Sequence, residues 1–456
     1  MRKTTPKRPD ETTVATLIDH SEERKRALRQ DNSDNATSFC GASGRWYTGI
    51  VDTYHGETGL PLDANAERAL RRAWDELLTK SLPADYSNDK LYDKRQPLIL
   101  QQLAADNLFS RLSYPTPEIS GIQVRPEEVI VCPYSSMVLI EEALATLARP
   151  NGVVVCPEGF YKNFGLSDRK LGLQIVTCPN TADNAFKVDA KALSACLASA
   201  RSTGNLCGIL LTLPGNPVVS TYSLEELMAI GRTLIHADVP IVLDMAFDRL
   251  VTDYVPLASL CIPTPSGEIR LYDRILSITG NSKGYNAFGP CKIGAACSGN
   301  QIWLKQLYNR LTVSFQRETT HLSRAVIAHT EGAYFEHNTR LMQKQHDIAL
   351  GHIRHINQRF RNNVLQPLGS PEGIFMGLCF DSVLLEAANI VTSSELEETL
   401  LQSVGIDSVA LDRTGSPRLG LRLNIFAPRK SVGQERQDLV EELFDRIEAF
   451  IESIHV

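Results

Sequence analysis

Residues 277–294 read SITGNSKGYNAFGPCKIG, and they continue an apolar run, RLYDRILS, at residues 270–277. This pattern predicts a buried strand that ends just before a lysine, Lys283, and a glycine-rich loop. A lysine in such a setting can form a Schiff base with an aldehyde cofactor, because burial and neighbouring cations lower the pKa of its amine and make it nucleophilic. Lysines before glycine-rich loops are common, so the interpretation depends on motifs elsewhere in the chain.

Two such motifs lie upstream of the lysine. Residues 213–218 read LPGNPV, and they stand between an apolar run at residues 207–213 and a helix expected to open at Ser223. Residues 239–247 read VPIVLDMAF, which predicts a buried strand ending at Asp244. Because ligands of open parallel sheets bind at the carboxyl ends of the strands, Asp244 is expected to face a ligand.

The three motifs together resemble those of the class I/II aminotransferase superfamily, the fold-type I pyridoxal phosphate (PLP) enzymes. The resemblance covers roughly residues 80–430. It implies an α/β fold like that of aspartate aminotransferase, in which a large domain has a central, mostly parallel seven-stranded sheet flanked by helices and a smaller α/β domain lies toward the C-terminus. Strand and helix patterns that alternate from about residue 85 to 325 agree with such a sheet.

The resemblance gives each motif a role toward PLP. Lys283 forms the Schiff base, and Ser282 beside it contacts the cofactor. Asp244 keeps the pyridine nitrogen protonated, which the ring requires in order to act as an electron sink. The side-chain amide of Asn216 donates a hydrogen bond to the phenolate oxygen. An ordinary strand-end or N-cap aspartate and a simple turn asparagine are the alternatives, and the occurrence of all three motifs in this order favours the cofactor roles.

A phosphate site is expected after the strand at residues 128–132 (EVIVC). A small-residue turn with Ser135 and Ser136 follows this strand and precedes an apolar helix. A helix N-terminus offers free N–H groups and the positive end of the helix dipole to a phosphate. Tyr134 is unusually bulky for this position in the family.

An aromatic residue that stacks on the pyridine ring is expected in residues 157–164, PEGFYKNF. Tyr161 matches the family best and Phe160 is the second candidate. The spacing of the aromatic residues is similar to that of 1-aminocyclopropane-1-carboxylate (ACC) synthases. A pair of aromatic residues buried in the core is the alternative interpretation.

The substrate carboxylate is expected to meet Arg422, the single charge within the strand-like run LGLRLNIF at residues 419–426. An arginine inside an apolar strand is costly unless it meets an anion, and its planar fork binds a carboxylate through two hydrogen bonds. An edge-strand arginine facing water is the alternative. By resemblance, Tyr86 reaches the phosphate of the cofactor in a neighbouring subunit, and Tyr92 competes for this role.

Three positions depart from the family pattern. Phe247 stands where a tyrosine normally donates to the phenolate oxygen, and the loss of this donor should raise the pKa of the Schiff base. Gly280 replaces a phosphate-binding serine. Cys291 replaces an arginine, and Lys292 beside it is the candidate phosphate cation, although as a point charge and not a fork.

Composition is that of a soluble enzyme. The 456 residues carry a net charge of −6, which argues against a nucleic-acid-binding surface. The ten cysteines are scattered and contain no CxxC pair, as expected for reduced thiols in the cytoplasm. No apolar run approaches the roughly 20 residues needed to span a bilayer, and no signal peptide is recognised. Three histidines on a predicted helix are interpreted as a solvated face, so no metal site is predicted.

Four segments are expected along the chain. Residues 1–45 form an N-terminal arm with a helical patch near residues 16–30, and residues 46–84 contribute to the small domain and the substrate entrance. Residues 85–325 form the large PLP-binding domain, and residues 326–456 form the small domain.

Within these segments, residues 64–80 are expected to form an amphipathic helix with Leu70, Trp74, Leu77 and Leu78 on one side. A long helical region from about residue 301 to 362 is expected to be interrupted near Gly332.

The predicted function is chemistry at the Cα atom of an amino acid, most simply transamination, in a homodimer. Elimination, cyclisation or replacement at the β or γ position, as in an ACC synthase that uses S-adenosylmethionine, is the alternative. A PLP-binding regulator would require a DNA-binding domain for which the first 40 residues are too short. The sequence does not identify the substrate, because specificity depends on loops and on the partner subunit.

Overall fold

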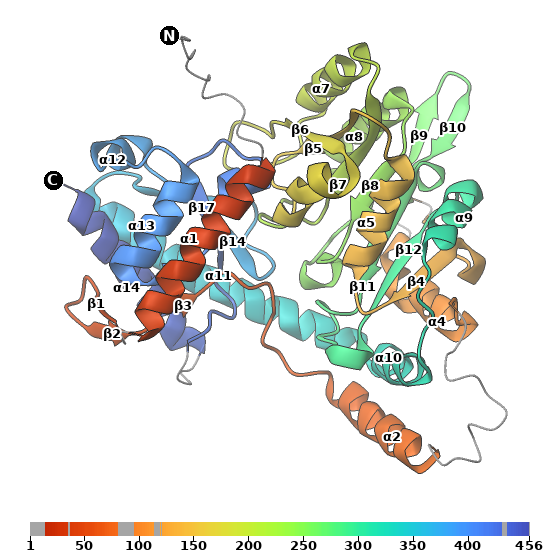
Figure 1. Ribbon diagram of the computed structural model, residues 1–456, viewed down its shortest axis with the longest axis horizontal. Helices are drawn as coiled ribbons and strands as arrows, with labels where there is room; N and C mark the ends of the chain where they lie inside the picture. The colour runs from red at the N-terminus through yellow and green to blue at the C-terminus, as the bar shows by residue number, and fades with distance from the viewer. Residues whose placement is uncertain are drawn as a thin grey trace, which may run out of the picture.

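The chain folds into two lobes that lie side by side and are bridged by a long helix, α11 (Gly332–Phe360) (Figure 1). The computed structural model describes residues 14–34, 37–80, 95–113, 119, 121–430 and 436–455. One lobe is organised around a seven-stranded sheet and the other around a four-stranded sheet.

The large sheet has the strand order β4-β12-β11-β8-β7-β5-β6. Strand β12 is antiparallel to both of its neighbours, and the remaining pairs are parallel. The prediction of an aspartate aminotransferase-like α/β fold with a mostly parallel sheet is confirmed. The strands are β4 (Val129–Pro133), β5 (Gly152–Pro157), β6 (Leu173–Cys178), β7 (Leu206–Thr212), β8 (Ile241–Asp244), β11 (Ile275–Gly280) and β12 (Ile293–Cys297).

Helices cover both faces of this sheet, so successive side chains of a strand enter two different cores. In β5, Val153 and Val155 pack into one core while Val154 and Cys156 pack into the other. The first core is covered by α2 (Ala64–Lys80), α4 (Leu98–Leu103), α7 (Ala190–Ser202), α8 (Leu224–Ala237) and α10 (Arg317–His329). The second is covered by α5 (Ser136–Leu147) and α9 (Gln301–Arg310), with the short helix α6 (Ser167–Leu171) nearby.

The small lobe has an antiparallel sheet with the strand order β13-β14-β17-β16. Its strands are β13 (Leu365–Leu368), β14 (Phe375–Phe380), β16 (Val409–Ala410) and β17 (Gly420–Asn424). Its helices, besides part of α11, are α12 (Ser382–Ala387), α13 (Ser393–Val404) and α14 (Arg436–Ile454). Aliphatic and phenylalanine side chains from these elements form a separate core.

Short strand pairs complete the fold. Strand β3 (Val51–Asp52) pairs in parallel with β15 (Ile406–Asp407), which ties the segment before α2 to the small lobe. A hairpin of β1 (Ser38–Cys40) and β2 (Trp46–Thr48) lies beside it, and β9 (Cys261–Thr264) pairs with β10 (Gly267–Arg270) at the far side of the large lobe.

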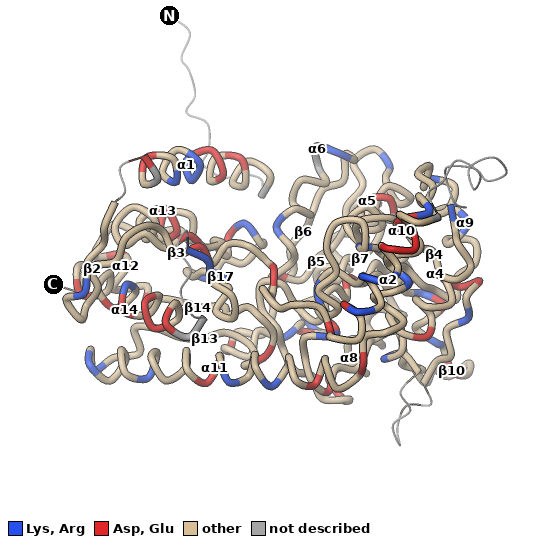
Figure 2. Tube along the Cα trace, turned by 90° about the horizontal axis from the view of Figure 1, so that it is seen from below, with Lys and Arg blue, Asp and Glu red and all other residues tan. Residues whose placement is uncertain are grey.

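The N-terminal helix α1 (Val14–Asp34) lies on the small lobe of its own chain and packs against α13. Figure 2 shows acidic and basic residues distributed along its length. The sequence predicted a helical patch here, and the structure shows a longer helix. The limits of the four predicted segments stay predictions.

Two other predictions on helices are confirmed in part or in full. Helix α2 covers the predicted residues 64–80, and Leu70 and Leu77 pack against the core. Trp74 and Leu78 were expected on the same packed side, yet they are 48% and 64% exposed. The predicted break near Gly332 separates α10 from α11. No helix in the described residues has the length and apolar character to cross a membrane.

Candidate active site

Most of the predicted site residues lie at one edge of the large sheet. Strands β4, β5, β7, β8 and β11 end at this edge, and Ser135, Tyr161, Asn216, Asp244 and Lys283 stand at or just after these strand ends. The small lobe faces this edge and contributes Arg422. The topology therefore gathers residues that are almost 290 positions apart in the chain.

Lys283 lies in a loop that Asn281 holds in place. The buried amide of Asn281 donates to the carbonyl of Cys291 at 2.8 Å and accepts from the N–H of Ile293 at 2.8 Å. The Lys283 amine donates to the carbonyl of Gly56 at 2.6 Å. Burial lowers the pKa of Lys283 to about 8, and the positive charges of Lys292 and Arg422 act in the same direction. The amine is thus partly neutral at physiological pH, as a nucleophilic lysine requires.

Asp244 is a buried carboxylate without a cationic partner in the described part of the chain. It ends β8 and accepts a hydrogen bond from the N–H of Ala246 at 3.0 Å. Burial raises the pKa of Asp244 to about 6, and the positive charge of Lys283 offsets only part of this effect. A protonated ring nitrogen placed against it would supply the missing counter-charge.

Asn216 and Arg422 are joined across the two lobes. Arg422 Nη1 donates to Asn216 Oδ1 at 2.9 Å, and Nη2 donates to the carbonyl of Tyr54. Arg422 sits on β17 between β14 and β16, so it is not the edge-strand arginine of the alternative interpretation. Burial lowers the pKa of Arg422 to about 10, and it forms no ion pair within the described residues. Such a guanidinium is available to a substrate carboxylate.

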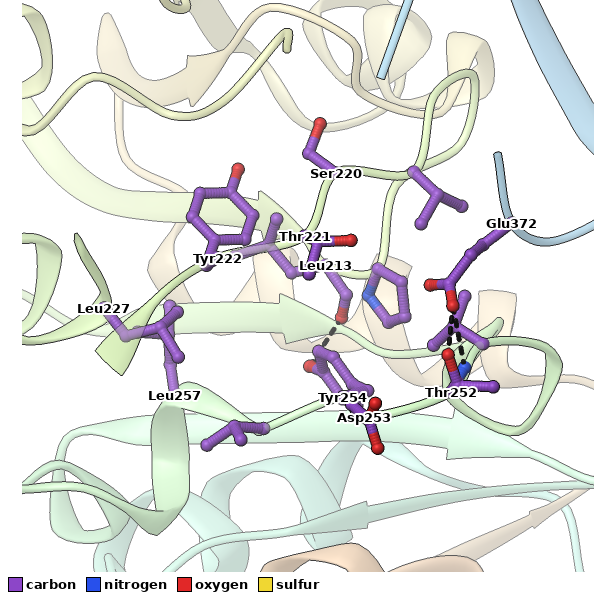
Figure 3. Close-up of a pocket in the computed structure, with 14 residues that line it drawn as sticks. Leu213, Ser220, Thr221, Tyr222, Leu227, Thr252, Asp253, Tyr254, Leu257 and Glu372 are labelled. Carbon is purple, nitrogen blue, oxygen red and sulfur yellow. Dashed lines mark hydrogen bonds between the residues drawn. The ribbon is translucent and has the colours of Figure 1, made fainter. Parts of the chain in front are cut away.

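The loop that carries Asn216 is tightly constrained. A side chain on Gly215 would overlap the carbonyl oxygen of Val218, so glycine is required at this position of the turn. The loop also borders a cavity of about 140 Å³, which Figure 3 shows and which none of the predicted site residues lines. There the hydroxyl of Tyr254 donates to the carbonyl of Leu213 at 2.8 Å and anchors the start of the loop.

The predicted phosphate site is the N-terminus of α5. Ser135 is the N-cap, and its hydroxyl accepts from the N–H of Met137 at 3.1 Å. Ser136 begins the helix, so its N–H lacks an acceptor within the helix. A Cβ on Gly294 would lie 2.6 Å from the nitrogen of Ser136, so this glycine lets β12 approach the helix end closely. The backbone of Lys292 borders the same corner, since its carbonyl accepts from the N–H of Tyr134 at 2.8 Å, and its positive charge acts on Lys283.

Tyr161 and Phe160, the two candidates for the stacking aromatic, have different environments. The hydroxyl of Tyr161 accepts from Asn163 at 2.9 Å. Burial raises the pKa of Tyr161 above its ordinary value, and the charge of Arg422 offsets part of this effect. Phe160 is buried in the second core of the large lobe, and its ring also lies against the small lobe, where a Cβ on Gly415 would be 2.5 Å from it. Tyr161 is the candidate nearer to the other site residues.

The three departures from the family pattern have structural counterparts. Phe247 packs in an apolar cluster, 5.4 Å from the ring of Phe375, and the Lys283 amine lies 5.8 Å from its centroid. Gly280 leaves no room for a serine, since its Cβ would lie 2.7 Å from the carbonyl oxygen of Ile293. Cys291 is buried in the core, and burial raises the pKa of its thiol to about 11.

Several neighbours of the site were not singled out from the sequence. The carbonyl groups of Tyr54 and Gly56 hold Arg422 and Lys283, and the negative charge of Glu57 acts on the pKa of Lys283. The prediction that residues 46–84 border the substrate entrance was the only signal for them. Asn281 directly precedes the Ser-Lys pair and carried no family signature. Tyr86 and Tyr92 lie outside the described residues.

The residues present fit PLP and an amino acid. Three groups lie around the amine of Lys283. The carboxylate of Asp244 is buried without a cation, and the amide nitrogen of Asn216 has no acceptor among the described residues. The Nε atom of the buried Arg422 guanidinium has no partner there either. Each of these groups matches one polar feature of the cofactor or substrate. A helix N-terminus with a nearby lysine matches the phosphate.

The fold and this site define a fold-type I PLP-dependent enzyme. Residues 94–428 match the family model described as "Aminotransferase class I and II". The chain therefore belongs to this family, whose members depend on PLP.

Individual relatives are distant. The probable N-succinyldiaminopimelate aminotransferase DapC of Mycobacterium tuberculosis is 27% identical over 186 residues, which is 40% of this chain and 43% of that protein. ACC synthase 4 of rice (Oryza sativa subsp. japonica) is 24% identical over 284 residues, covering 57% of this chain and 55% of the relative. A mutant of Thermus thermophilus aspartate aminotransferase superposes with a TM-score of 0.69 at 15% identity, covering 98% of this chain and 100% of that structure. The chain thus spans less than half of the first of these relatives, and the structural likeness shows the fold.

Proposed function

We propose that this protein is a PLP-dependent aminotransferase that acts on an α-amino acid. The observation that carries the proposal is the meeting of Lys283 and Arg422 at the junction of the two lobes, with Asp244 and Asn216 beside them. The family membership of residues 94–428 supports it. The particular amino acid is not specified by these residues, because they address groups that all α-amino acids share.

Each residue has a distinct role in this proposal. Arg422 binds the substrate α-carboxylate and so orients the Cα–H bond toward Lys283. Lys283, whose pKa is lowered to about 8, would take the Cα proton as a neutral amine and, as the resulting ammonium, would deliver it to the C4′ carbon of the cofactor. Asp244 would hold the proton on the ring nitrogen of PLP, and the amide N–H of Asn216 would donate a hydrogen bond to the phenolate oxygen. PLP, when bound, supplies a reactive aldehyde and a ring that takes up negative charge.

The remaining cofactor contacts follow from position. Ser135, Ser136 and Lys292 bind the phosphate at the N-terminus of α5. Tyr161 covers the ring face, and Ser282 contacts the cofactor beside Lys283.

A homodimer is part of the proposal. Tyr134 and Phe288 flank the phosphate corner and the Lys283 loop and are 49% and 56% exposed, while Trp74 and Leu78 are exposed on α2. Large apolar side chains exposed near a site are typical of an interface between subunits. Tyr86 would then reach the partner's cofactor. All ten cysteines are unpaired, which supports a cytoplasmic location.

Elimination or cyclisation is the second candidate. Two observations favour it, namely the likeness of part of the chain to rice ACC synthase and the phenylalanine at position 247. Both leave the roles of Lys283 and Arg422 unchanged.

A spectroscopic assay distinguishes the two candidates. The holoenzyme is mixed with a panel of amino acids and, separately, with S-adenosylmethionine, and products are analysed by mass spectrometry. Transamination converts bound cofactor to pyridoxamine phosphate and releases a 2-oxo acid. Release of methylthioadenosine from S-adenosylmethionine, without pyridoxamine phosphate, would support the second candidate instead.

A further inference from the structure

The face of helix α1 that lies on the small lobe is largely polar. Ala15 and Ile18 are buried at its start, and Ser21 and Lys25 continue the same face. The Lys25 amine is fully buried, 2.9 Å from the carboxylate of Glu397 and 2.5 Å from that of Asp407. Buried ion pairs add little stability compared with an apolar contact of the same size, and their best-attested effect is to fix register. The ion pairs of Lys25 therefore fix the register of α1 on the small lobe, and with it the position of the other residues of the helix.

In this register Glu22 links the two lobes. Its Oε1 atom accepts hydrogen bonds from the hydroxyl of Tyr54 at 2.6 Å, from Arg413 Nη1 at 3.1 Å and from the ammonium of Lys162. Lys162 follows Tyr161 in the large lobe, whereas Arg413 is a fully buried residue of the small lobe. Opposite charges from both lobes hold the pKa of Glu22 down to about 2 although burial raises it. The carboxylate is thus charged at all physiological pH values.

The ring of Tyr54 is surrounded by cations that Glu22 helps to place. The amines of Lys162 and Lys25 lie 4.3 and 4.4 Å from its centroid, and the guanidinium of Arg29 lies 4.9 Å away. Cations over a ring face attract it electrostatically. The side chain of Tyr54 is therefore held both at its hydroxyl and at its ring.

The backbone of Tyr54 reaches the substrate-binding arginine. Its carbonyl accepts from Arg422 Nη2, and the only other hydrogen bond of that guanidinium within the described residues is to Asn216. These two acceptors determine the direction in which the planar fork points, together with the ring of Phe375, whose centroid lies 4.0 Å from the guanidinium carbon. A shift of Tyr54 would turn the fork away from the place where a carboxylate must bind.

We propose that Glu22 and Tyr54 are positioning residues that aim Arg422 at the substrate α-carboxylate, so that helix α1 is a working part of the active site. This inference rests on the proposed function, because it needs Arg422 to bind a carboxylate. It adds two residues to the determinants of substrate binding, namely Glu22 of the N-terminal helix and Tyr54, which is 368 positions away from Arg422.

The test compares two probes that react with the aldehyde of bound PLP. Aminooxyacetate carries a carboxylate, whereas methoxyamine does not, and both reactions are followed by the change in visible absorption. The ratio of their second-order rate constants reports how well Arg422 is aimed and does not require turnover. The Arg422→Lys variant is the reference, because loss of the planar fork is expected to lower this ratio. If it does not lower the ratio, Arg422 does not bind the carboxylate, and the role given to it above fails together with this inference.

The Glu22→Gln variant is expected to lower the ratio about tenfold, the size of one hydrogen bond to a charged group. Tyr54→Phe should have a similar effect, and the double variant should lose little more, because each substitution alone removes the charge-assisted hydrogen bond between the Tyr54 hydroxyl and the Glu22 carboxylate. The matched control is Arg24→Gln, which breaks an exposed ion pair from the same helix to Glu398 and should leave the ratio unchanged.

Thermal unfolding of each holoenzyme separates positioning from stability. If Glu22→Gln lowers the unfolding midpoint but leaves the probe ratio at the wild-type value while Arg422→Lys lowers it, α1 only supports the fold. An equal change in the ratio for Arg24→Gln would also overturn the inference, because the effect would then belong to the helix as a whole.

Discussion

Two regions of this protein bury carboxylates, and their pKa values move in opposite directions. Asp244, at the edge of the large sheet, has its pKa raised to about 6 by burial because no cation of the described chain pairs with it. Burial also acts to raise the pKa of Glu397 beneath helix α1, but Lys25 and Arg413 more than offset this and hold it below the usual value. The difference teaches that a buried charge matched by its own chain belongs to the scaffold, whereas an unmatched one indicates a ligand.

Substitution of the unmatched carboxylate should have the largest effect on function. Asp244→Asn removes the charge that keeps the ring nitrogen protonated, so turnover is expected to fall by about 10²–10³-fold with some cofactor retained. Cofactor-free Asp244→Asn protein should unfold at a higher temperature than wild type at pH 7, since a desolvated charge is lost. Turnover and calorimetry measure both, and near wild-type turnover would show that another group protonates the ring.

Substitution of the matched carboxylate is the corresponding control. Glu397→Gln leaves Lys25 and Arg413 without a full counter-charge, so the unfolding midpoint should drop, since breaking a buried pair costs about 3–5 kcal/mol. The fraction of cofactor bound by the folded protein should not change. If Glu397→Gln unfolds at the wild-type midpoint but no longer binds PLP, Glu397 belongs to the cofactor site and the distinction between the two regions is wrong.

The pH dependence of cofactor capture tests the second unmatched group, Lys283. Its pKa is lowered to about 8, so the neutral, nucleophilic amine predominates only above that pH. The rate at which cofactor-free protein captures PLP should rise about tenfold per pH unit up to pH 8 and then level off. Stopped-flow absorption measures this rate, and a rise that continues to pH 10 would mean that the amine is not perturbed.

Arg422 is the third unmatched charge, and geometry matters there as much as sign. Arg422→Lys keeps the charge but loses the planar fork, so KM for the amino acid should rise about tenfold or more while kcat changes less. Steady-state kinetics with the best substrate of the panel provide the measurement. Arg24→Gln on the exposed side of α1 is the control, and equal effects of the two substitutions would remove Arg422 from the substrate site.

Phe247→Tyr should have the smallest effect. Phe247 lies in an apolar cluster 5.8 Å from the Lys283 amine, where a new hydroxyl could donate to the phenolate oxygen of PLP. Such a donor should lower the pKa read from the visible absorption of the bound cofactor by about one unit. If titrations of variant and wild type coincide, another residue already supplies this hydrogen bond.

The sequence predicted the unmatched region much better than the matched one. Asp244 ends a buried strand, and Asn216 and Lys283 each follow a buried strand and a short turn, so these local requirements leave a local signature. Glu22 and Tyr54 meet partners that are 391 and 368 residues away. The buried face of α1 includes Ser21 and Lys25, so it has no apolar periodicity that sequence reasoning can detect.

The departures were visible in the sequence, but their causes were not. Gly280 was noted as a missing serine, and only the packing of β11 against β12 shows that a side chain does not fit there. The different environments of Phe160 and Tyr161 were likewise not visible in the sequence: the ring of Phe160 is buried and lies against Gly415, whereas the charges of Arg422 and Asp244 act on Tyr161. Pattern identified the residue types, and tertiary contacts decided their orientation.

The central claim is that Lys283 is the residue that holds PLP, and one measurement tests it most directly. The purified protein is incubated with PLP, reduced with borohydride and digested, and the modified peptide is identified by mass spectrometry. The account predicts a pyridoxyl group on Lys283 alone, with none on Lys292 or Lys162. Attachment at a different lysine, or no attachment after incubation with PLP, would contradict the account.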